Sequence, residues 1–267
     1  MYGDRNGGGR QNVPVADRSG AGDPAQTLRL LWRAGAEGAR GPRRKLGVDD
    51  VVRAGVAVAD EQGTPGLTIR KVAERLGTGA MTVYTYVPGR AELLDLMIDL
   101  IELEMPRPPL GQRRGVDRLR AVADSNREML RAHPWLAMVH PGRPTLGPGA
   151  TAKYDHELAA FDGLGIDDVV CDDVLQQVLA FVRSAVRLEV ATSAAEAESG
   201  ASDEQWWAAA GPLLAEVLDP DAYPRAVRIG AAAGAARGSA LAPDHFWTFG
   251  LDTLLAGLTA QVPELGA

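Results

Sequence analysis

The chain has 267 residues, a formal net charge of −7, 46% hydrophobic and 24% charged residues, and one cysteine, Cys171. This length and composition predict one large or two smaller globular domains, and they exclude a disulfide within the chain. No apolar run approaches the roughly 20 residues of a membrane span, and the start of the chain lacks a leader pattern. We therefore expect a cytoplasmic protein with no membrane partner.

Positive charge is concentrated near the start of the chain, although the total is acidic. The first 46 residues hold nine Lys and Arg against four Asp and Glu, whereas the remainder after residue 105 holds fourteen against twenty-one. Between them, residues 68–90 hold four cationic side chains against one carboxylate: Arg70, Lys71, Arg75, Arg90 and Glu74. Because Lys and Arg supply affinity for phosphate, this local excess is compatible with a nucleic-acid partner beside an acidic body.

The N-terminal part, residues 1–45, is interpreted as a disordered and basic extension. Residues 1–24 are rich in Gly, Asn, Asp and Arg without periodicity, and residues 25–32 are compatible with a short helix. The extension ends in a basic run made of Arg40, Arg43, Arg44 and Lys45. This run is either a solvated linker or an arm that contacts DNA.

Helical signals begin at Val48, where apolar residues recur every three or four positions. Gly63 ends the first helix, Thr68 is placed as an N-cap for the second, and Gly77 ends it. A Pro-Gly pair at residues 88–89 separates a short third helix from a fourth. The predicted helices of this part, residues 46–105, are 48–63, 69–77, 79–87 and 90–105.

The rest of the chain, residues 106–267, also predicts helices and almost no strand. Residues 192–204 are expected to be a mobile loop and residues 230–242 a low-complexity connection. The predicted helices are 116–132, 150–164, 168–192, 206–218, 220–230 and 244–261. The fold class is therefore all-α, with an N-terminal three-helix head of the helix-turn-helix type and a C-terminal helical body.

Residues 46–96 resemble the DNA-binding head of the tetracycline-repressor family without a gap. The resemblance rests on TIRKVAERLG at residues 68–77, TVYTYV at residues 82–87, and a basic residue before ELL at residues 90–94. It implies that residues 79–87 form the recognition helix that enters the major groove of operator DNA. Two positions depart from the family's pattern, because Gly79 replaces a frequent Ser and Tyr86 a frequent His.

Position on the helices gives each head residue an expected role on double-stranded DNA. Thr68 and Arg70 are candidates for phosphate, as are Tyr84 and Tyr86, and Arg90 matches the family's basic phosphate-binding position. Base edges are expected to face the side chains that point away from the inward Val83 and Val87. The candidates for base contacts are Thr78, Gly79, Met81, Thr82 and Thr85.

Residues 118–149 resemble the regulatory body of one branch of the same family, through HPWL at residues 133–136 and RPTLGP at residues 143–148. The resemblance implies a homodimer built from the two late long helices, here 168–192 and 244–261, and a cavity for an amphiphilic small molecule. By periodicity alone the stripes of these helices could equally be internal core. Replacing Leu251 and Leu255 by Glu is the corresponding test of the interface.

Large side chains with apolar bodies and polar tips are the candidates for the ligand pocket. Aromatic residues at helical spacing are also typical of plain core. Because Trp206 and Trp207 are adjacent, only one of them is expected to point inward. The candidates are Trp135, His140, Tyr154, Phe161, Phe181, Trp206 and Trp207.

Other function classes receive little support from the sequence. It contains no Gly-rich phosphate loop after a strand, no nucleophile elbow and no cluster of metal ligands, so we expect neither an enzyme nor a metal or other cofactor. The remaining alternative is a dimeric DNA-binding regulator without a small-molecule ligand. A repressor released by a ligand is the expectation that the resemblance favours.

Overall fold

The computed structural model describes residues 18–33, 46–111, 113–140 and 142–267. Within these residues it is helical, with one isolated bridge between Arg18 and His140 and no sheet, which confirms the all-α class. The chain divides into two compact units, Met1–Pro108 with Met138–His156, and Pro109–Ala137 with Glu157–Ala267. None of the helices in the described ranges is long and apolar enough to cross a membrane.

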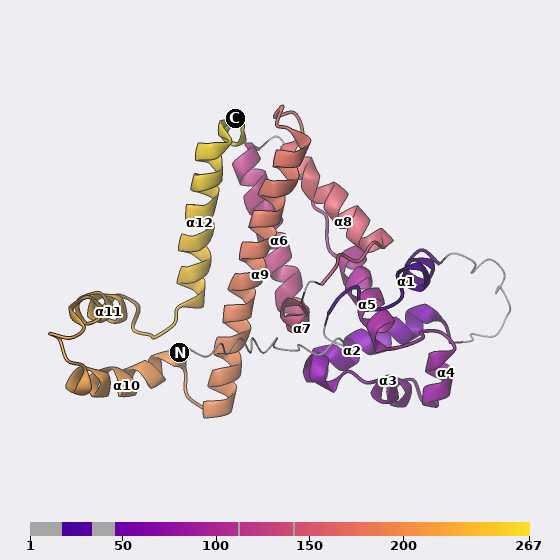
Figure 1. Cartoon of the computed structure of the whole chain (residues 1–267), viewed down its shortest axis with the longest axis horizontal. Coiled ribbons are helices and arrows are strands. Elements are labelled where there is room, and N and C mark those ends of the chain that lie inside the picture. Colours follow the sequence, from indigo (N-terminus) through magenta and orange to yellow (C-terminus); the bar gives the residue numbers. More distant parts are fainter. Residues whose placement is uncertain (1–17, 34–45, 112, 141) are drawn as a thin grey trace, which may run out of the picture. The chain divides into compact units, whose positions relative to one another are not determined.

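The helices are labelled in Figure 1. The first unit contains α1 (Pro24–Leu31), α2 (Val48–Gly66), α3 (Ile69–Arg75), α4 (Ala80–Tyr84), α5 (Arg90–Glu104) and most of α8 (Pro148–Leu158). The second unit contains α6 (Gly115–Ala132), most of α7 (Pro134–Met138), the 3-10 turn η2 (Ala159–Phe161), α9 (Asp168–Ser199), α10 (Asp203–Val217), α11 (Pro224–Arg237), α12 (Pro243–Gln261) and η3 (Pro263–Gly266).

Local signals set the ends of the three head helices α2, α3 and α4. Gly63 has a φ of +67°, in the left-handed region that favours glycine, and it interrupts the helical backbone of α2 where the sequence predicts its end. The Thr68 hydroxyl oxygen caps α3 by accepting the Lys71 N–H at 3.2 Å, as predicted. On the inner side of α4, Val83 and Val87 are buried. The helix-turn-helix arrangement therefore follows from caps, one glycine and a short apolar stripe.

Helix α5 runs through the core of the first unit, because every residue from Leu93 to Asp99 is buried. Two of these residues are carboxylates that accept backbone N–H groups. Asp95 accepts the Gly20 N–H at 2.9 Å, and Asp99 accepts the Ala150 N–H at 2.9 Å in the first turn of α8. Burial raises the pKa of both carboxyls, that of Asp95 to about 6.

Residues 18–24 have a defined structure, so the expectation of disorder up to residue 24 is wrong for these residues. The Ser19 hydroxyl donates to the Arg143 carbonyl at 2.7 Å, and the Ser19 N–H donates to the His140 carbonyl at 3.2 Å. Helix α1 packs against α5. These backbone partners are invisible in a sequence pattern because they lie about 120 positions downstream. Residues 1–17 and the basic run within residues 34–45 lie outside the described residues.

Helix α8 begins in close contact with α5, and two glycines permit that approach. A Cβ atom at Gly149 would collide with the backbone of Asp99 and lie 2.8 Å from the Leu103 nitrogen. A Cβ at Gly147 would collide with the Asp99 carboxylate. The LGPG segment at residues 146–149 therefore serves close packing between backbones, and it brings residues 138–156 into the first unit.

Helices α6, α9 and α12 pack side by side and form the core of the second unit (Figure 1). Leu251 and Leu255 of α12 are 0% and 2% exposed, and Val178 of α9 is fully buried. The predicted apolar stripes are therefore the internal core of one subunit, and assigning Leu251 and Leu255 to a dimer interface is wrong. The exposed side of α12 carries other apolar residues, among them Phe246 and Phe249.

Two regions predicted to be irregular are helical. Helix α9 continues to Ser199 through the predicted loop, and α11 covers residues 230–237 of the predicted connection. Alanine has the highest helix propensity of all residues, and these stretches are rich in it. Gly200 and Gly238, with φ values of +70° and +65°, end these helices as left-handed caps.

Candidate functional site

The outer side of α4 presents the predicted recognition residues to solvent. Met81 is 77% exposed and Tyr84 is 46% exposed, although both are large and apolar. Gly79 and Thr85 are also exposed, and Thr78, Thr82 and Tyr86 are half-buried. The structure thus brings the predicted base-contacting residues to one short helix and its flanks.

Hydroxyl groups at this surface are already partly used within the head. The Thr85 hydroxyl donates to the Thr82 carbonyl at 2.6 Å, so toward DNA it offers its lone pairs and its methyl group. The Thr68 hydroxyl oxygen accepts the Lys71 N–H as the cap of α3, while its own proton remains available to a phosphate oxygen. Thr68 is thus suited to a phosphate contact and Thr85 to an apolar or accepting contact with a base.

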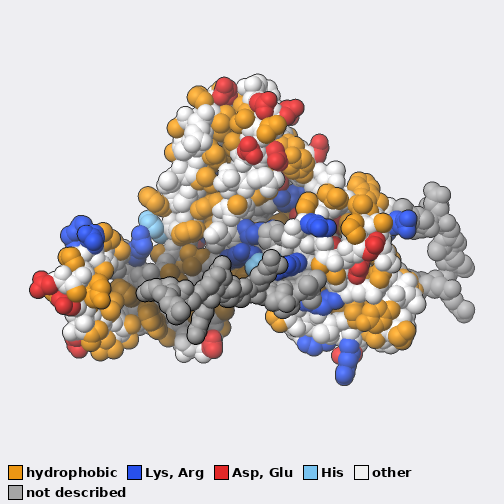
Figure 2. All heavy atoms as spheres, viewed as in Figure 1, with side chains coloured by type: hydrophobic (Ala, Val, Ile, Leu, Met, Phe, Trp, Pro, Cys, Tyr) orange, Lys and Arg blue, Asp and Glu red, His pale blue; other side chains and the backbone are white. Residues whose placement is uncertain are grey.

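Cationic side chains gather over α3, along the lower edge of the molecule in Figure 2. The Arg70 side chain is 86% exposed and pairs with Glu74 on the same helix, with 2.8 Å between Nε and Oε1. Arg75 pairs with Glu61 at 2.7 Å. Exposed ion pairs of this kind contribute little to stability, so the Arg70 guanidinium is readily redirected to a phosphate.

Arg90 is held inside the head. Its Nε donates to the Leu67 carbonyl at 2.8 Å and one of its terminal nitrogens donates to the Thr64 carbonyl at 2.6 Å. The Thr64 carbonyl belongs to the last residues of α2 and the Leu67 carbonyl directly follows this helix, and both residues are buried. The phosphate contact that the sequence predicts for Arg90 stays a prediction, and in the structure its guanidinium ties the start of α5 to the end of α2.

We expect Arg90→Ala to lower the free energy of unfolding of the first unit by about 1–3 kcal/mol, because the Leu67 and Thr64 carbonyls each lose a charged donor. Chemical denaturation measures this change. Arg70→Ala is the matched control, since it removes an equal charge from an exposed pair and should change stability by less than about 0.5 kcal/mol. Both variants should weaken DNA binding. Equal stability of the two variants would contradict a structural role for Arg90.

The seven ligand-pocket candidates are distributed over both units. Trp135 and Phe161 are buried in the second unit, whereas His140 and Tyr154 are exposed in the first. Trp206 is 53% exposed and Trp207 is half-buried, which agrees with the expectation that only one of the two points inward. The role of each candidate as a ligand contact stays a prediction.

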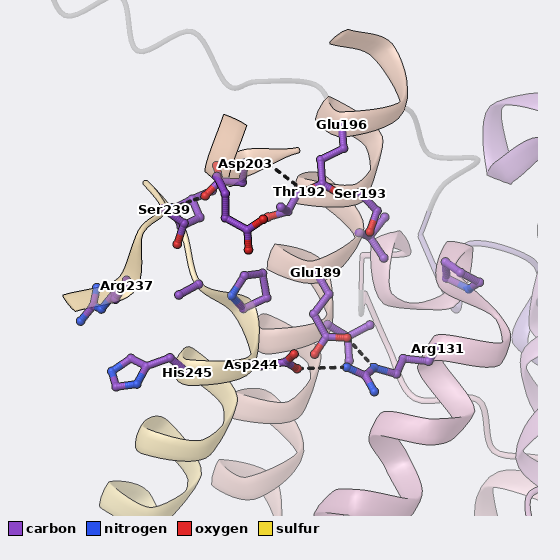
Figure 3. A pocket seen from close by; sticks show the side chains of 17 residues that line it. Arg131, Glu189, Thr192, Ser193, Glu196, Asp203, Arg237, Ser239, Asp244 and His245 are labelled. Carbon is purple, nitrogen blue, oxygen red and sulfur yellow. Dashed lines mark hydrogen bonds and ion pairs between the residues drawn. The ribbon is translucent and has the colours of Figure 1, made fainter. Parts of the chain in front are cut away.

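The following three cavities, each lined by residues that the structure describes, lie within the second unit. One of 520 Å³ lies between α9 and α12 and includes Phe181, whose ring stacks on Phe246 with 5.8 Å between centroids. A second, of 480 Å³, lies inside the hairpin of α10 and α11 and includes Trp207. The third, of 640 Å³, is lined by polar residues of α6, α9, α10, α11 and α12 (Figure 3). Phe181 and Trp207 therefore line separate cavities.

The family model described as "Tetracyclin repressor-like, C-terminal domain" matches residues 106–262, which is more than half of the chain. This chain belongs to the TetR family of transcription regulators. The HTH-type transcriptional repressor DrrR1 of Streptomyces coeruleorubidus is 36% identical over 260 residues, covering 96% of this chain and 93% of that protein. The class A tetracycline repressor protein from transposon 1721 of Escherichia coli is 31% identical over 178 residues, covering 66% and 81%.

Solved structures of TetR-family proteins share the fold. The Streptomyces coelicolor protein ActR in complex with actinorhodin matches with a TM-score of 0.67 and 25% identity, covering 82% of this chain and 98% of that one. ActR in complex with (S)-DNPA matches with a TM-score of 0.62 and 27% identity, covering 81% and 98%. These similarities, with the exposed recognition helix, make the chain a DNA-binding transcription regulator.

Sequence reasoning missed the residues of the polar cavity. Glu196 and Ser239 lie in stretches that the sequence predicts to be a loop and a low-complexity connection. Their proximity depends on α9 and α11 being helical and on the fold bringing the ends of those helices together. No sequence motif with a fixed spacing predicts such a site, because its residues come from five separate helices or their flanks.

Proposed function

We propose that this TetR-family protein is a homodimeric repressor that leaves its operator when an amphiphilic small molecule binds to it. The names of its relatives support repression, and the ActR complexes show that a protein of this fold binds small molecules. The observation that carries the DNA-binding half of the proposal is the exposed apolar and hydroxyl-bearing side of α4. Met81 and Tyr84 together place apolar surface on the exposed side of this five-residue helix, where base edges and sugars can cover it.

On operator DNA, α4 enters the major groove with Met81, Thr82 and Thr85 toward base edges. Tyr84, Tyr86 and the residues at the start of α3 contact phosphates, which fix the register of the head. Arg90 also acts indirectly, because its hydrogen bonds tie the start of α5 to the end of α2 and the residue that follows it. Thr82→Ala should therefore change which bases are preferred, whereas Arg70→Ala should weaken binding to all sequences.

The dimer interface is assigned to the exposed sides of α9 and α12. Phe249 is 63% exposed and Phe246 is 40% exposed, and both line the 520 Å³ cavity between these helices. A dimer formed through this surface would carry two copies of α4. Both copies must lie about 34 Å apart, or a multiple of that distance, to enter successive major grooves.

Release by a ligand requires that binding favour a spacing of the two heads that does not match the operator. Asp99 ties the first turn of α8 to α5, and α5 begins at Arg90 beside the recognition helix. A ligand that displaces α8 would therefore pull α5 through this carboxylate and through the close contact at Gly149. Tyr154 of α8 and His140, which both belong to the first unit, are the proposed ligand contacts in this region.

Titrating a ligand with and without a saturating operator duplex tests this proposal, with actinorhodin as the first probe. A ligand that drives release must bind at least about tenfold more weakly to the DNA complex, which corresponds to 1.4 kcal/mol of coupling. Equal dissociation constants would contradict release. If a panel of amphiphilic aromatic compounds yields no ligand, the alternative function of a dimeric regulator without a ligand is favoured.

A further inference from the structure

The 640 Å³ cavity of the second unit lies where the ends of several helices meet (Figure 3). The second half of α9 and the first turn of α10 form one wall, and the end of α11 with the start of α12 forms another. Arg131 at the end of α6 closes a third side. This volume is in the range of small-molecule sites in proteins.

One end of the cavity is electrically balanced. Glu189 accepts hydrogen bonds from Arg127 and Arg131, with 2.6 Å between the closest atoms in each pair, and Asp244 accepts one from Arg127 at 2.9 Å. Arg127 also lies over the Trp247 ring, with 4.3 Å from its guanidinium carbon to the ring centroid. Two carboxylates and two guanidinium groups neutralise each other here. This end therefore has no charge left to offer a ligand.

The opposite end has an excess of negative charge. Glu196 accepts the Asp203 N–H at 3.0 Å, and Asp203 accepts the Leu241 N–H at 2.9 Å. These two residues and Glu204 form no ion pair within the described ranges, and Arg237 is the cation that lines this end. The positive ends of α10 and α12 and the negative ends of α9 and α11 are all present, so the helix dipoles cancel approximately. Two carboxylate charges therefore remain uncompensated.

A hydroxyl without a partner marks the same end. Ser239 is 8% exposed, lines the cavity beside Asp203 in Figure 3, and makes no side-chain hydrogen bond to any residue that the structure describes. The hydroxyl is therefore available to a ligand in the cavity, as both a donor and an acceptor. Apolar side chains complete the walls, among them Val186, Val190 and Leu241. The combination requires a ligand with an apolar body, a positive charge and a hydrogen-bonding group.

We propose that this cavity is a binding site for an amphiphilic organic cation, such as an amine carried on an aromatic or aliphatic body. The cationic group lies between Glu196 and Asp203, a polar group of the ligand pairs with the Ser239 hydroxyl, and the apolar body covers Val186 and Leu241. Arg131 is occupied by Glu189, so an anionic ligand would meet the carboxylates without a free cation at the balanced end. The site does not depend on where the regulatory ligand binds.

Dansylcadaverine is a suitable probe, because it joins a fluorescent aromatic body to a primary amine, and its N-acetyl derivative is a neutral counterpart. On the full-length protein we expect saturable binding of the amine, at least about tenfold tighter than that of the acetylated compound. Glu196→Gln combined with Asp203→Asn should weaken binding of the amine at least about tenfold and leave the acetylated compound nearly unchanged. Ser239→Ala should weaken binding of both compounds.

Glu216→Gln is the matched control for charge, because Glu216 is exposed on α10 and does not line the cavity. This variant should bind the amine as the parent protein does. Equal affinities for the two compounds, an equal loss in the control, or the absence of saturable amine binding below about 1 mM would each overturn the proposal. Operator binding is measured in parallel for every variant, and retained binding shows that the fold is intact. If the parent protein itself does not bind an operator, this result contradicts only the proposed repressor function.

Discussion

A Phe249→Glu substitution is expected to convert the protein into monomers and to weaken operator binding by about 100-fold or more. The Phe249 ring is 63% exposed on α12 and lines the cavity beside Phe181. In a dimer that buries this surface, Glu would place an unpaired charge at the interface and remove a large apolar contact. Loss of the dimer separates the two heads, so the second head no longer gains from the binding of the first.

Light scattering gives the oligomeric state of this variant, and binding to an operator duplex gives the affinity. Leu146→Glu is the matched control, because Leu146 is 58% exposed and lies outside α9 and α12. It should leave both measurements unchanged. A dimeric Phe249→Glu variant would show that the subunits meet elsewhere. Leu251→Glu is unsuitable for this test, since Leu251 is fully buried and its replacement would unfold the second unit.

Asp95→Asn should raise the free energy of unfolding at pH 8 by about 1–3 kcal/mol and change it little at pH 4. The Asp95 carboxyl is 1% exposed, and desolvation raises its pKa from 3.8 to about 6. As the pH rises, the Asp95 carboxyl therefore loses its proton at a lower pH in the unfolded state than in the folded state. For this group, the free energy of unfolding is highest below about pH 4 and falls as the pH rises through about 6, where the buried carboxyl ionises.

An Asn at residue 95 keeps the oxygen that accepts the Gly20 N–H and cannot ionise, so the decline between pH 4 and pH 6 should become smaller. Urea denaturation across this range measures the difference. Asp155→Asn provides a control on an exposed position of α8 and should shift stability at all pH values by a similar small amount. A decline of unchanged size in Asp95→Asn would contradict the assignment of the proton to Asp95.

The sequence predicts the head more accurately than the body for a physical reason. Its helices end at caps and glycines, such as Thr68 and Gly63, whose effects are local. The buried side chains of α4 repeat at helical spacing, so the exposed recognition residues follow by elimination. The inward turn of Arg90 escapes this reasoning, because its partners lie more than 20 residues away.

In the body, the same periodicity predicts where the helices lie, but it does not predict which surface packs against their apolar sides. The stripe through Leu251 and Leu255 has the spacing of either an internal core or a dimer interface, and only the packing of α12 against α9 and α6 decides for the core. Helices α9 and α11 extend through Ala-rich stretches that look like linkers when they are read by composition alone. The cavity at Ser239 exists only because α9 and α11 extend through these stretches and α12 packs against α9.

The return of residues 138–156 to the first unit means that the DNA-reading half of this protein is discontinuous in sequence. A fragment cut after Met105 would retain α5 but lose the first turn of α8, which accounts for the hydrogen bonds to Asp99 and for the contact at Gly149. It would also lose the carbonyls that hold Ser19 and Trp32. The head therefore cannot be transferred alone to another protein. A chimera that exchanges DNA specificity between relatives must also include the segment around residues 146–149.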